Sequence, residues 1–319
     1  MLVSLTDSSL AANALSSGND ILFTSSDGLT KLNYERESYT SSTGQLIAWV
    51  QIPTLSATTD TTIYMYYGNS SASDQQNQSA TWNSNYLGVW HFPNGTTLSV
   101  SDSTGLNTAT NDGATATTTG QIYGGAGFNG SNEYINLGSS LSSTGSETME
   151  FWTNTSNCSS GALQAYVVSS TSDGFAVGCN SSVWVASAAG TNAGSVQSTV
   201  APSSANTFVV ATKTTGAATN IYINGTNVTT ASTGSNYWAV ATVQRILGGS
   251  WTSGAQSSPM AGMLDEFRLS NTALSAGWIQ TEYNNQLYPR YFYALSGSTL
   301  QTRSADIPLI KIRGGVRFH

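Results

Sequence analysis

The chain has 319 residues, which is long enough for two β domains and a tail. Charged residues make up only 8% and aromatic residues 10%, which excludes a disordered chain, since such chains are usually poor in aromatics and rich in charge. A net charge of −7 excludes a broad phosphate-binding surface, so nucleic acid is not an expected partner.

The sequence also bears on where the protein works. It has no run of about 18 apolar residues, so we expect no membrane span. Met1 leads directly into Leu2 and Val3, without the basic and apolar regions of a secretory signal. Either a signal was replaced by Met1, or the protein leaves the cell by another route, such as in a virus particle released by lysis. We expect an extracellular, cell-surface or virion-surface location.

The first 85 residues read as short strands separated by turns. The β-rich runs are Ile21–Phe23, Leu46–Ile52 and Thr62–Tyr67, and Ser-Asp-Gly, Ser-Thr-Gly and Gly-Asn segments lie between them. This alternation of strand and turn signals predicts a small β-sandwich domain over residues 1–85.

The segments NDILFTSSDGLTKLNYERESY, GQLIAWVQIPTLS and TTIYMYYGN resemble the family called domain of unknown function 2341. That family typically opens with one more strand, similar to YRKKITI, which is absent here. A sheet without its edge strand exposes unpaired backbone groups. The edge can be trimmed, paired with another part of this chain, or covered by a strand from a neighbouring subunit. The sequence does not decide between these three.

Residues 86–287 resemble a laminin G-like jelly roll of the concanavalin A-like superfamily. The resemblance is carried by GVWHF, GGAGFNGSNEYINLG, SETMEFW, NIYINGTNV and the closing run AGMLDEFRLSNTALSAGWIQTEYNNQ. In that run, Met263, Asp265, Phe267 and Leu269 alternate with Leu264, Glu266 and Arg268 as in a strand, and Leu274, Trp278 and Ile279 form an apolar helical face. Asn224-Gly225 predicts a two-residue type I′ hairpin turn. The expected fold is therefore all-β, a small sandwich followed by a jelly-roll sandwich.

The two cysteines, Cys158 and Cys179, lie in segments that both read as strand or strand edge. A disulfide between neighbouring strands and two small buried thiols are both compatible with this pattern. Neither cysteine has the spacing or the histidine partners of a zinc site.

Residues 288–319 form a basic tail that differs from the rest of the chain. It contains five of the ten lysines and arginines, namely Arg290, Arg303, Lys311, Arg313 and Arg317. The segment IPLIKIRGGVRFH alternates apolar and basic residues, as in a strand that docks on an acidic partner or adds to a sheet edge. A solvated tail held against the acidic body of its own chain is the alternative. Lys311, Arg313 and Arg317 are the candidate assembly residues.

The carboxylates of the jelly roll do not form an expected catalytic pair. Glu147 and Glu150 are three positions apart and so lie on opposite faces of a strand, and the adjacent Asp265 and Glu266 diverge. A serine-histidine-aspartate site would need His91, whose place in GVWHF looks structural. We therefore expect no catalytic residues and no enzyme, with a glycoside hydrolase of the concanavalin A-like superfamily as the alternative.

Calcium is the one cofactor that the resemblance suggests, since jelly rolls of this superfamily often hold one calcium ion. The candidate oxygen donors are Asn129, Asn132, Glu133 and Asp265. The segment Asn129-Gly130-Ser131-Asn132 is equally good turn chemistry without a metal, so both interpretations stay open.

Carbohydrate recognition needs an exposed aromatic face with amides and hydroxyls nearby. Tyr237, Trp238 and Trp251 are the candidates, because they lie in loop-like, glycine-rich sequence. Covering the end of the sandwich is the alternative role for these rings. The other tryptophans in apolar patterns, Trp49, Trp90, Trp152 and Trp278, are expected in the core.

Three classes of function remain: a recognition or adhesion module that binds a glycan or a surface protein, a structural subunit of an extracellular or virion assembly, and a glycosidase. The carboxylate pattern disfavours the glycosidase. We expect a homo-oligomer or a larger assembly, and the sequence does not separate the first two classes.

Overall fold

The computed structural model describes residues 1–56, 58–138, 141, 145–155, 158, 164–168, 175–180, 183–188, 195–214, 219–231, 245–252, 255–301 and 307–314. The chain forms two compact units, the first of Met1–Asn83 with Asn284–His319 and the second of Ser84–Tyr283. Residues 288–319, which the sequence set apart as a basic tail, thus belong to the same compact unit as the N-terminal segment.

The first unit is built on two antiparallel sheets around an apolar core. The three-stranded sheet has the order β1-β4-β3 and the four-stranded sheet the order β2-β5-β25-β24. The strands are β1 (Leu2–Thr6), β2 (Leu22–Thr24), β3 (Tyr34–Thr40), β4 (Gln45–Val50), β5 (Thr61–Tyr66), β24 (Ala294–Gln301) and β25 (Ile307–Gly314). Three short helices accompany them: α1 (Ser8–Asn13), α2 (Gln78–Thr81) and α4 (Pro289–Phe292).

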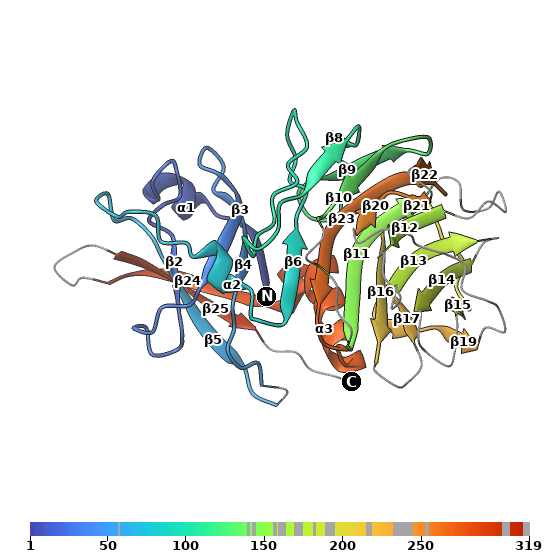
Figure 1. Ribbon diagram of the computed structural model, residues 1–319. Helices are drawn as coiled ribbons and strands as arrows, with labels where there is room; N and C mark the ends of the chain where they lie inside the picture. The colour runs from blue at the N-terminus through green and yellow to red at the C-terminus, as the bar shows by residue number, and fades with distance from the viewer. Residues whose placement is uncertain are drawn as a thin grey trace. The chain divides into compact units, whose positions relative to one another are not determined.

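Strand β25 adds the end of the chain to the sheet of the first unit (Figure 1). All six residues of β5 pair with β25, from Thr61 opposite Gly314 to Tyr66 opposite Leu309, whereas β2 pairs with only three of them. The pairing begins after Pro308, which has no backbone N–H to donate. Strand β5 therefore has a partner on each side, β2 from near the start of the chain and β25 from near its end.

The second unit is a sandwich of two large antiparallel sheets (Figure 1). One sheet has the order β18-β17-β16-β11-β23-β9-β8, with β6 also paired to β23, and the other β19-β15-β14-β13-β12-β20-β10-β7. The first sheet contains β6 (Tyr86–Trp90), β8 (Thr115–Thr117), β9 (Gly125–Asn129), β11 (Glu147–Thr155), β16 (Thr207–Lys213), β17 (Asn220–Ile223), β18 (Thr226–Asn227) and β23 (Ala261–Ser270). The second contains β7 (Thr110–Asp112), β10 (Tyr134–Asn136), β12 (Gln164–Val168), β13 (Phe175–Asn180), β14 (Val183–Ala188), β15 (Ser195–Ser198), β19 (Thr229–Ala231) and β20 (Ile246–Leu247).

A separate hairpin joins β21 (Ser250–Thr252) to β22 (Ala255–Ser257). The predicted turn at Asn224-Gly225 is also present, because both residues have positive φ and Ile223 pairs directly with Thr226. The predicted fold class is confirmed: the chain is mostly β, and its second unit is a sandwich of two antiparallel sheets.

The core of the second unit lies between its two sheets. Met149 and Phe151 of β11 and Phe267 of β23 are fully buried there, and they face Phe175 and Trp184 of the opposite sheet. Cys158 and Cys179 are joined by a disulfide with their Cα atoms 6.0 Å apart, so the disulfide alternative holds in this structure. Closing a loop of this length stabilises a fold by about 3 kcal/mol in the chain-entropy model.

Helix α3 (Ala276–Leu287) covers the outer face of the sheet that contains β11 and β16. Tyr283 stacks on Trp152 and Phe208, with ring centroids 5.9 and 6.3 Å apart, and Ile279 is fully buried. The expectation that Trp278 is core is wrong, because 49% of its surface is exposed. No helix within the described ranges combines the length and the apolar character needed to cross a membrane.

Candidate functional site

One set of buried charged groups in the second unit lies at a β-bulge in β23. On one side β23 pairs with β9 through residues 261–264 and with β6 through residues 267–270, so Asp265 and Glu266 lie where its partner changes. On the other side the register with β11 shifts between Glu150 and Trp152. Glu266 has a φ of 53°, a conformation that costs a residue other than glycine roughly 1–2 kcal/mol.

The bulge changes the predicted alternation of β23. The expected pattern placed Phe267 and Leu269 on the face of Asp265, but Phe267 and Leu269 lie in the core together with Leu264. Arg268 therefore points to the outer face of the sheet, where it meets carboxyl groups. The alternation was wrong at this point because a bulge inserts one residue and reverses the faces of all residues after it.

Arg268 is the centre of a buried cluster of carboxyl groups. Its Nη2 donates to Glu266 Oε2 at 2.8 Å, and its Nη1 lies 3.6 Å from Glu150 Oε1 and 3.6 Å from Glu282 Oε1. The side chains of Arg268, Glu150 and Glu266 are at most 2% exposed. Tyr86 of β6 donates its hydroxyl to Glu282 Oε1 at 3.3 Å. We call Tyr86, Glu150, Glu266, Arg268 and Glu282 the Arg268 cluster.

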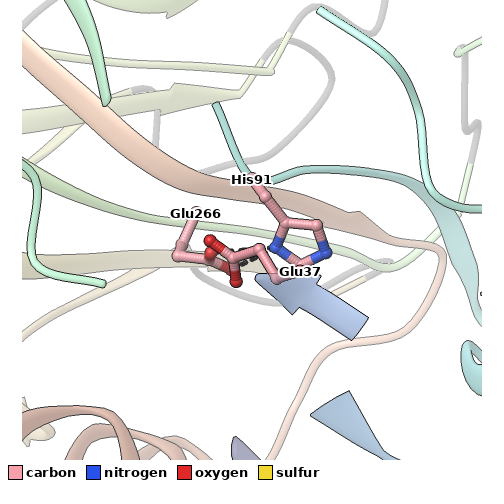
Figure 2. Close-up of side chains that lie close together, drawn as sticks. All are labelled: Glu37, His91 and Glu266. Carbon is pink, nitrogen blue, oxygen red and sulfur yellow. Dashed lines mark hydrogen bonds and ion pairs between the residues drawn. The ribbon is translucent and has the colours of Figure 1, made fainter. Parts of the chain in front are cut away.

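His91 joins this cluster through Glu266. Figure 2 shows the imidazole beside the carboxyl group, with His91 Nδ1 2.8 Å from Oε1 and 2.9 Å from Oε2 of Glu266. The side chains are 5% and 0% exposed. Both oxygens of Glu266 are therefore engaged, one by His91 alone and the other by His91 and Arg268. These hydrogen bonds fix the position of the Glu266 carboxyl group.

Burial and like charge govern ionisation in the Arg268 cluster. Burial, followed by the charge of Glu282, raises the pKa of Glu150 well above its ordinary value. Burial by itself lowers the pKa of Arg268, but Glu266, Glu282 and Glu150 together raise it above the ordinary value of an arginine. The arginine stays charged, and the carboxyl group of Glu150 is favoured in its neutral form.

Replacing Glu150 with glutamine is expected to change how stability depends on pH. The raised pKa means that folded Glu150 keeps its proton at pH values where the unfolded chain has lost it. The folded state then binds more protons, so this group makes stability fall as pH rises from the ordinary glutamate pKa towards the raised one. Glu150→Gln removes this titration, and the variant should lose less stability than the parent chain over that window. Urea unfolding at a series of pH values measures the difference.

Asp60→Asn is the control for that experiment, since it removes an exposed carboxylate from the other unit. Its stability should follow that of the parent chain across the same pH series. Parallel curves for Glu150→Gln and the parent chain would contradict the assignment of the protonated carboxyl group to Glu150.

The predicted calcium donors fall into two places with separate hydrogen bonds. Asn129 Oδ1 accepts the Ser131 N–H at 2.8 Å, and Glu133 Oε2 accepts the Asn129 N–H at 2.6 Å, as in a closed turn. Asp265 Oδ2 instead accepts the backbone N–H groups of Gln121 and Ile122 at 2.8 and 3.0 Å. Burial raises the pKa of Asp265 well above its ordinary value, followed by the charge of Glu266. Calcium binding by Asn129, Asn132, Glu133 and Asp265 remains a prediction.

A second set of buried charges joins the two sheets of the sandwich. Glu147 forms an ion pair with Arg245, whose Nη2 also donates to the Leu141 carbonyl at 2.9 Å, and Glu147 Oε2 lies 3.9 Å from Lys213 Nζ. Lys213 also lies 5.8 Å from the ring centre of Phe175. Glu147 and Glu150 therefore have separate partners on opposite faces of β11, as their spacing in the sequence predicted.

The predicted aromatic and tail residues are only partly described. Tyr237, Trp238 and Arg317 lie outside the described residues. Trp251 lies in β21, opposite Gln256 of β22. Lys311 and Arg313 lie in β25, opposite Tyr64 and Thr62 of β5. A role for these residues in ligand binding or assembly remains a prediction.

Sequence reasoning did not single out Arg268 or Glu282. A signal was present, because only 8% of the residues are charged and Arg268 stands between apolar residues of a strand. An arginine in such a place is buried only with partners. The identity of those partners depends on the bulge and on helix α3, and neither can be derived from the strand alone.

Two family models match the chain. Residues 17–104 match the family described as domain of unknown function 2341, and residues 129–280 match the concanavalin A-like lectin/glucanases superfamily. No curated protein is significantly similar to the chain.

Several solved structures are similar to the chain at low sequence identity. The binding domain of Paraclostridial Mosquitocidal Protein 1 is 13% identical with a TM-score of 0.50, over 71% of this chain and 63% of that one. Domain 4 of AbnA, an extracellular arabinanase from Geobacillus stearothermophilus solved with arabinotriose, is 17% identical with a TM-score of 0.45, over 61% of this chain and 97% of that one. A structure of botulinum neurotoxin type C, whose cell entry depends on two ganglioside molecules, is 14% identical with a TM-score of 0.49, over 70% and 57%.

The chain covers less than two thirds of the length of the mosquitocidal protein domain and of the botulinum neurotoxin structure. At 13% identity, the likeness to the mosquitocidal protein domain shows the fold alone. The family matches agree with the order of segments inferred from the sequence. The chain carries a segment of the domain of unknown function 2341 family, followed by a domain of the concanavalin A-like lectin/glucanase superfamily.

Proposed function

We propose that the protein is a non-catalytic recognition module that works outside the cell or on a particle surface and binds carbohydrate. The observation that carries the proposal is the burial of the carboxyl groups of the sandwich around arginine and lysine side chains. Glu150 and Glu266 are buried around Arg268, and Glu147 is buried against Arg245 and Lys213. Hydrolysis of a glycosidic bond needs two carboxyl groups that reach the sugar from opposite sides. Carboxyl groups that are buried around cations of the fold in this way are poorly placed to reach a sugar from opposite sides.

Two further observations support the location and the kind of partner. The disulfide between Cys158 and Cys179 is typical of proteins that work in an oxidising environment. The net charge of −7 is unfavourable for binding to polyanions, so an uncharged or weakly charged ligand suits the surface better.

Incubation of the protein with a glycan array, together with an assay for newly released reducing ends, tests the proposal. We expect binding to at least one class of glycan and no release of reducing ends. Release of reducing ends that is lost in Glu150→Gln would favour the glycoside hydrolase instead. An array without any binding above background would contradict carbohydrate recognition. Measuring the particle mass of the intact protein then tests whether it is a structural subunit of a larger assembly.

A further inference from the structure

A groove of the first unit is lined by segments from both ends of the chain. Its volume is about 690 Å³, and its lining comes from β1, from Asp60 before β5, and from the segment Arg290–Leu295. All of these residues belong to the first unit. Ligand sites for small molecules usually have volumes of about 300–1,000 Å³, so the groove is large enough for an oligosaccharide of about two or three rings.

The base of the groove is fixed by a buried tyrosine. The hydroxyl group of Tyr293 donates to the Ser4 carbonyl at 2.6 Å and accepts the Ser4 N–H at 2.9 Å. Tyr293 is 5% exposed, and burial raises its pKa to about 12, so the hydroxyl keeps the proton that it donates. Strand β1 and the segment after helix α4 are thereby held together, and the base of the groove is formed before any ligand arrives.

An aromatic ring stands at the groove and is almost fully exposed. Tyr291 is 88% exposed, and it lies in the single turn of α4 that begins at Pro289. The next residue, Phe292, is only 7% exposed and anchors the turn. The ring of Tyr288 meets that of Tyr291 edge to face at a centroid distance of 5.9 Å and is itself 57% exposed. An exposed face of this kind can stack on the apolar face of a sugar ring.

The groove also contains one positively and one negatively charged side chain. Arg290 and Asp60 are exposed lining residues, and neither has an ion pair or a hydrogen bond with a residue that the structure describes. Arginine supplies only donors and a carboxylate only acceptors, which together match the hydroxyl groups of a sugar. Arg290 and Asp60 carry opposite charges, so these two lining residues together add no net charge.

We propose that this groove binds a neutral oligosaccharide, which stacks on Tyr291 and has its hydroxyl groups bound by Arg290 and Asp60. The proposal rests on the recognition function proposed above and adds the site and the class of ligand. It places the ligand in the first unit rather than at Tyr237, Trp238 and Trp251 of the sandwich, where the sequence predicted it.

The test compares four variants of the full chain on one set of probes. The probes are neutral di- to tetrasaccharides of glucose, galactose, mannose and arabinose, together with sialylated counterparts, and the tightest binder is then titrated by calorimetry. We expect a neutral probe to bind and Tyr291→Ala to weaken binding by about tenfold or more, because the stacking surface is lost. Trp278→Ala is the matched control, since it removes an exposed aromatic ring outside the groove. Trp251→Ala tests the site predicted from the sequence.

The outcomes distinguish a failure of the groove proposal from a failure of the recognition function proposed above. Unchanged binding in Tyr291→Ala, with a loss of binding in Trp251→Ala, would overturn the groove as the binding site. It would leave carbohydrate recognition by the protein intact. Preference for the sialylated probes would overturn the neutral ligand class. Absence of binding to every probe would overturn both proposals. Thermal unfolding of each variant must match that of the parent chain, and Tyr291→Phe, which keeps the ring, should retain binding.

Discussion

Replacing Arg268 with methionine is expected to destabilise the second unit by about 3–5 kcal/mol, because the change leaves buried carboxyl groups without their cation. Glu150, Glu266 and Glu282 all lie within 3.6 Å of the guanidinium group, and the side chain of Arg268 is 2% exposed. Methionine fills much of the space but supplies no charge and no donor. Urea unfolding, followed by hydrogen exchange in peptides from β11 and β23, measures the loss.

Two further substitutions separate the charge of Arg268 from its shape and position. Arg268→Lys keeps the charge but loses the planar fork that reaches several carboxyl groups, so an intermediate loss is expected. Arg290→Met removes an exposed arginine and should change stability by less than about 0.5 kcal/mol. Equal losses in Arg268→Met and Arg290→Met would show that the Arg268 cluster does not hold the sheet together.

Ending the chain at Gln301, which removes β25, is expected to unfold the first unit or to expose β5 within it. Every residue of β5 pairs with β25, and each lost hydrogen bond removes about 0.5–1.5 kcal/mol of stability. The summed loss is comparable with the total stability of a domain, about 5–15 kcal/mol. Hydrogen exchange of residues 61–66 should therefore accelerate by about a hundredfold or more, while peptides from β11 keep their protection.

A chain that ends at Gly314 is the matched control, because it loses only the residues that follow β25. Its exchange at residues 61–66 should equal that of the full chain. A synthetic peptide of residues 302–314 should restore protection when it is added to the shorter chain. Unchanged exchange in the chain that ends at Gln301 would contradict the pairing of β25 with β5.

Local patterns were sufficient to predict that the chain is mostly β. The turn at Asn224-Gly225, the long strand β23 and the helix after it follow from alternation and turn chemistry, and each is present in the structure. The placement of Glu147 and Glu150 on opposite faces of β11 also follows from spacing alone. These inferences succeeded because each depends on residues that are near neighbours in the chain.

The same local patterns failed where a single residue changed the register. The face of Arg268 was predicted incorrectly because strict alternation was continued through Asp265 and Glu266, whereas the bulge at Glu266 shifts it by one residue. The burial of Trp278 was also predicted incorrectly, since helical spacing gives the apolar side of a helix but not how far the covered sheet extends beneath it. Both errors concern positions at which a neighbouring element decides the outcome.

The sequence by itself determined that the chain is an acidic all-β protein, because strand periodicity, turn residues and charge are local or additive properties. The jelly-roll sandwich was implied by the resemblance to a known family. Only the tertiary structure decided that Arg268 gathers Glu150, Glu266 and Glu282, that β25 pairs with β5, and that Ser4 and Tyr293 form the base of one groove. Each of these contacts except that between Arg268 and Glu266 joins residues far apart in the chain. Contacts of this kind depend on how complete sheets and helices pack, which no local pattern encodes.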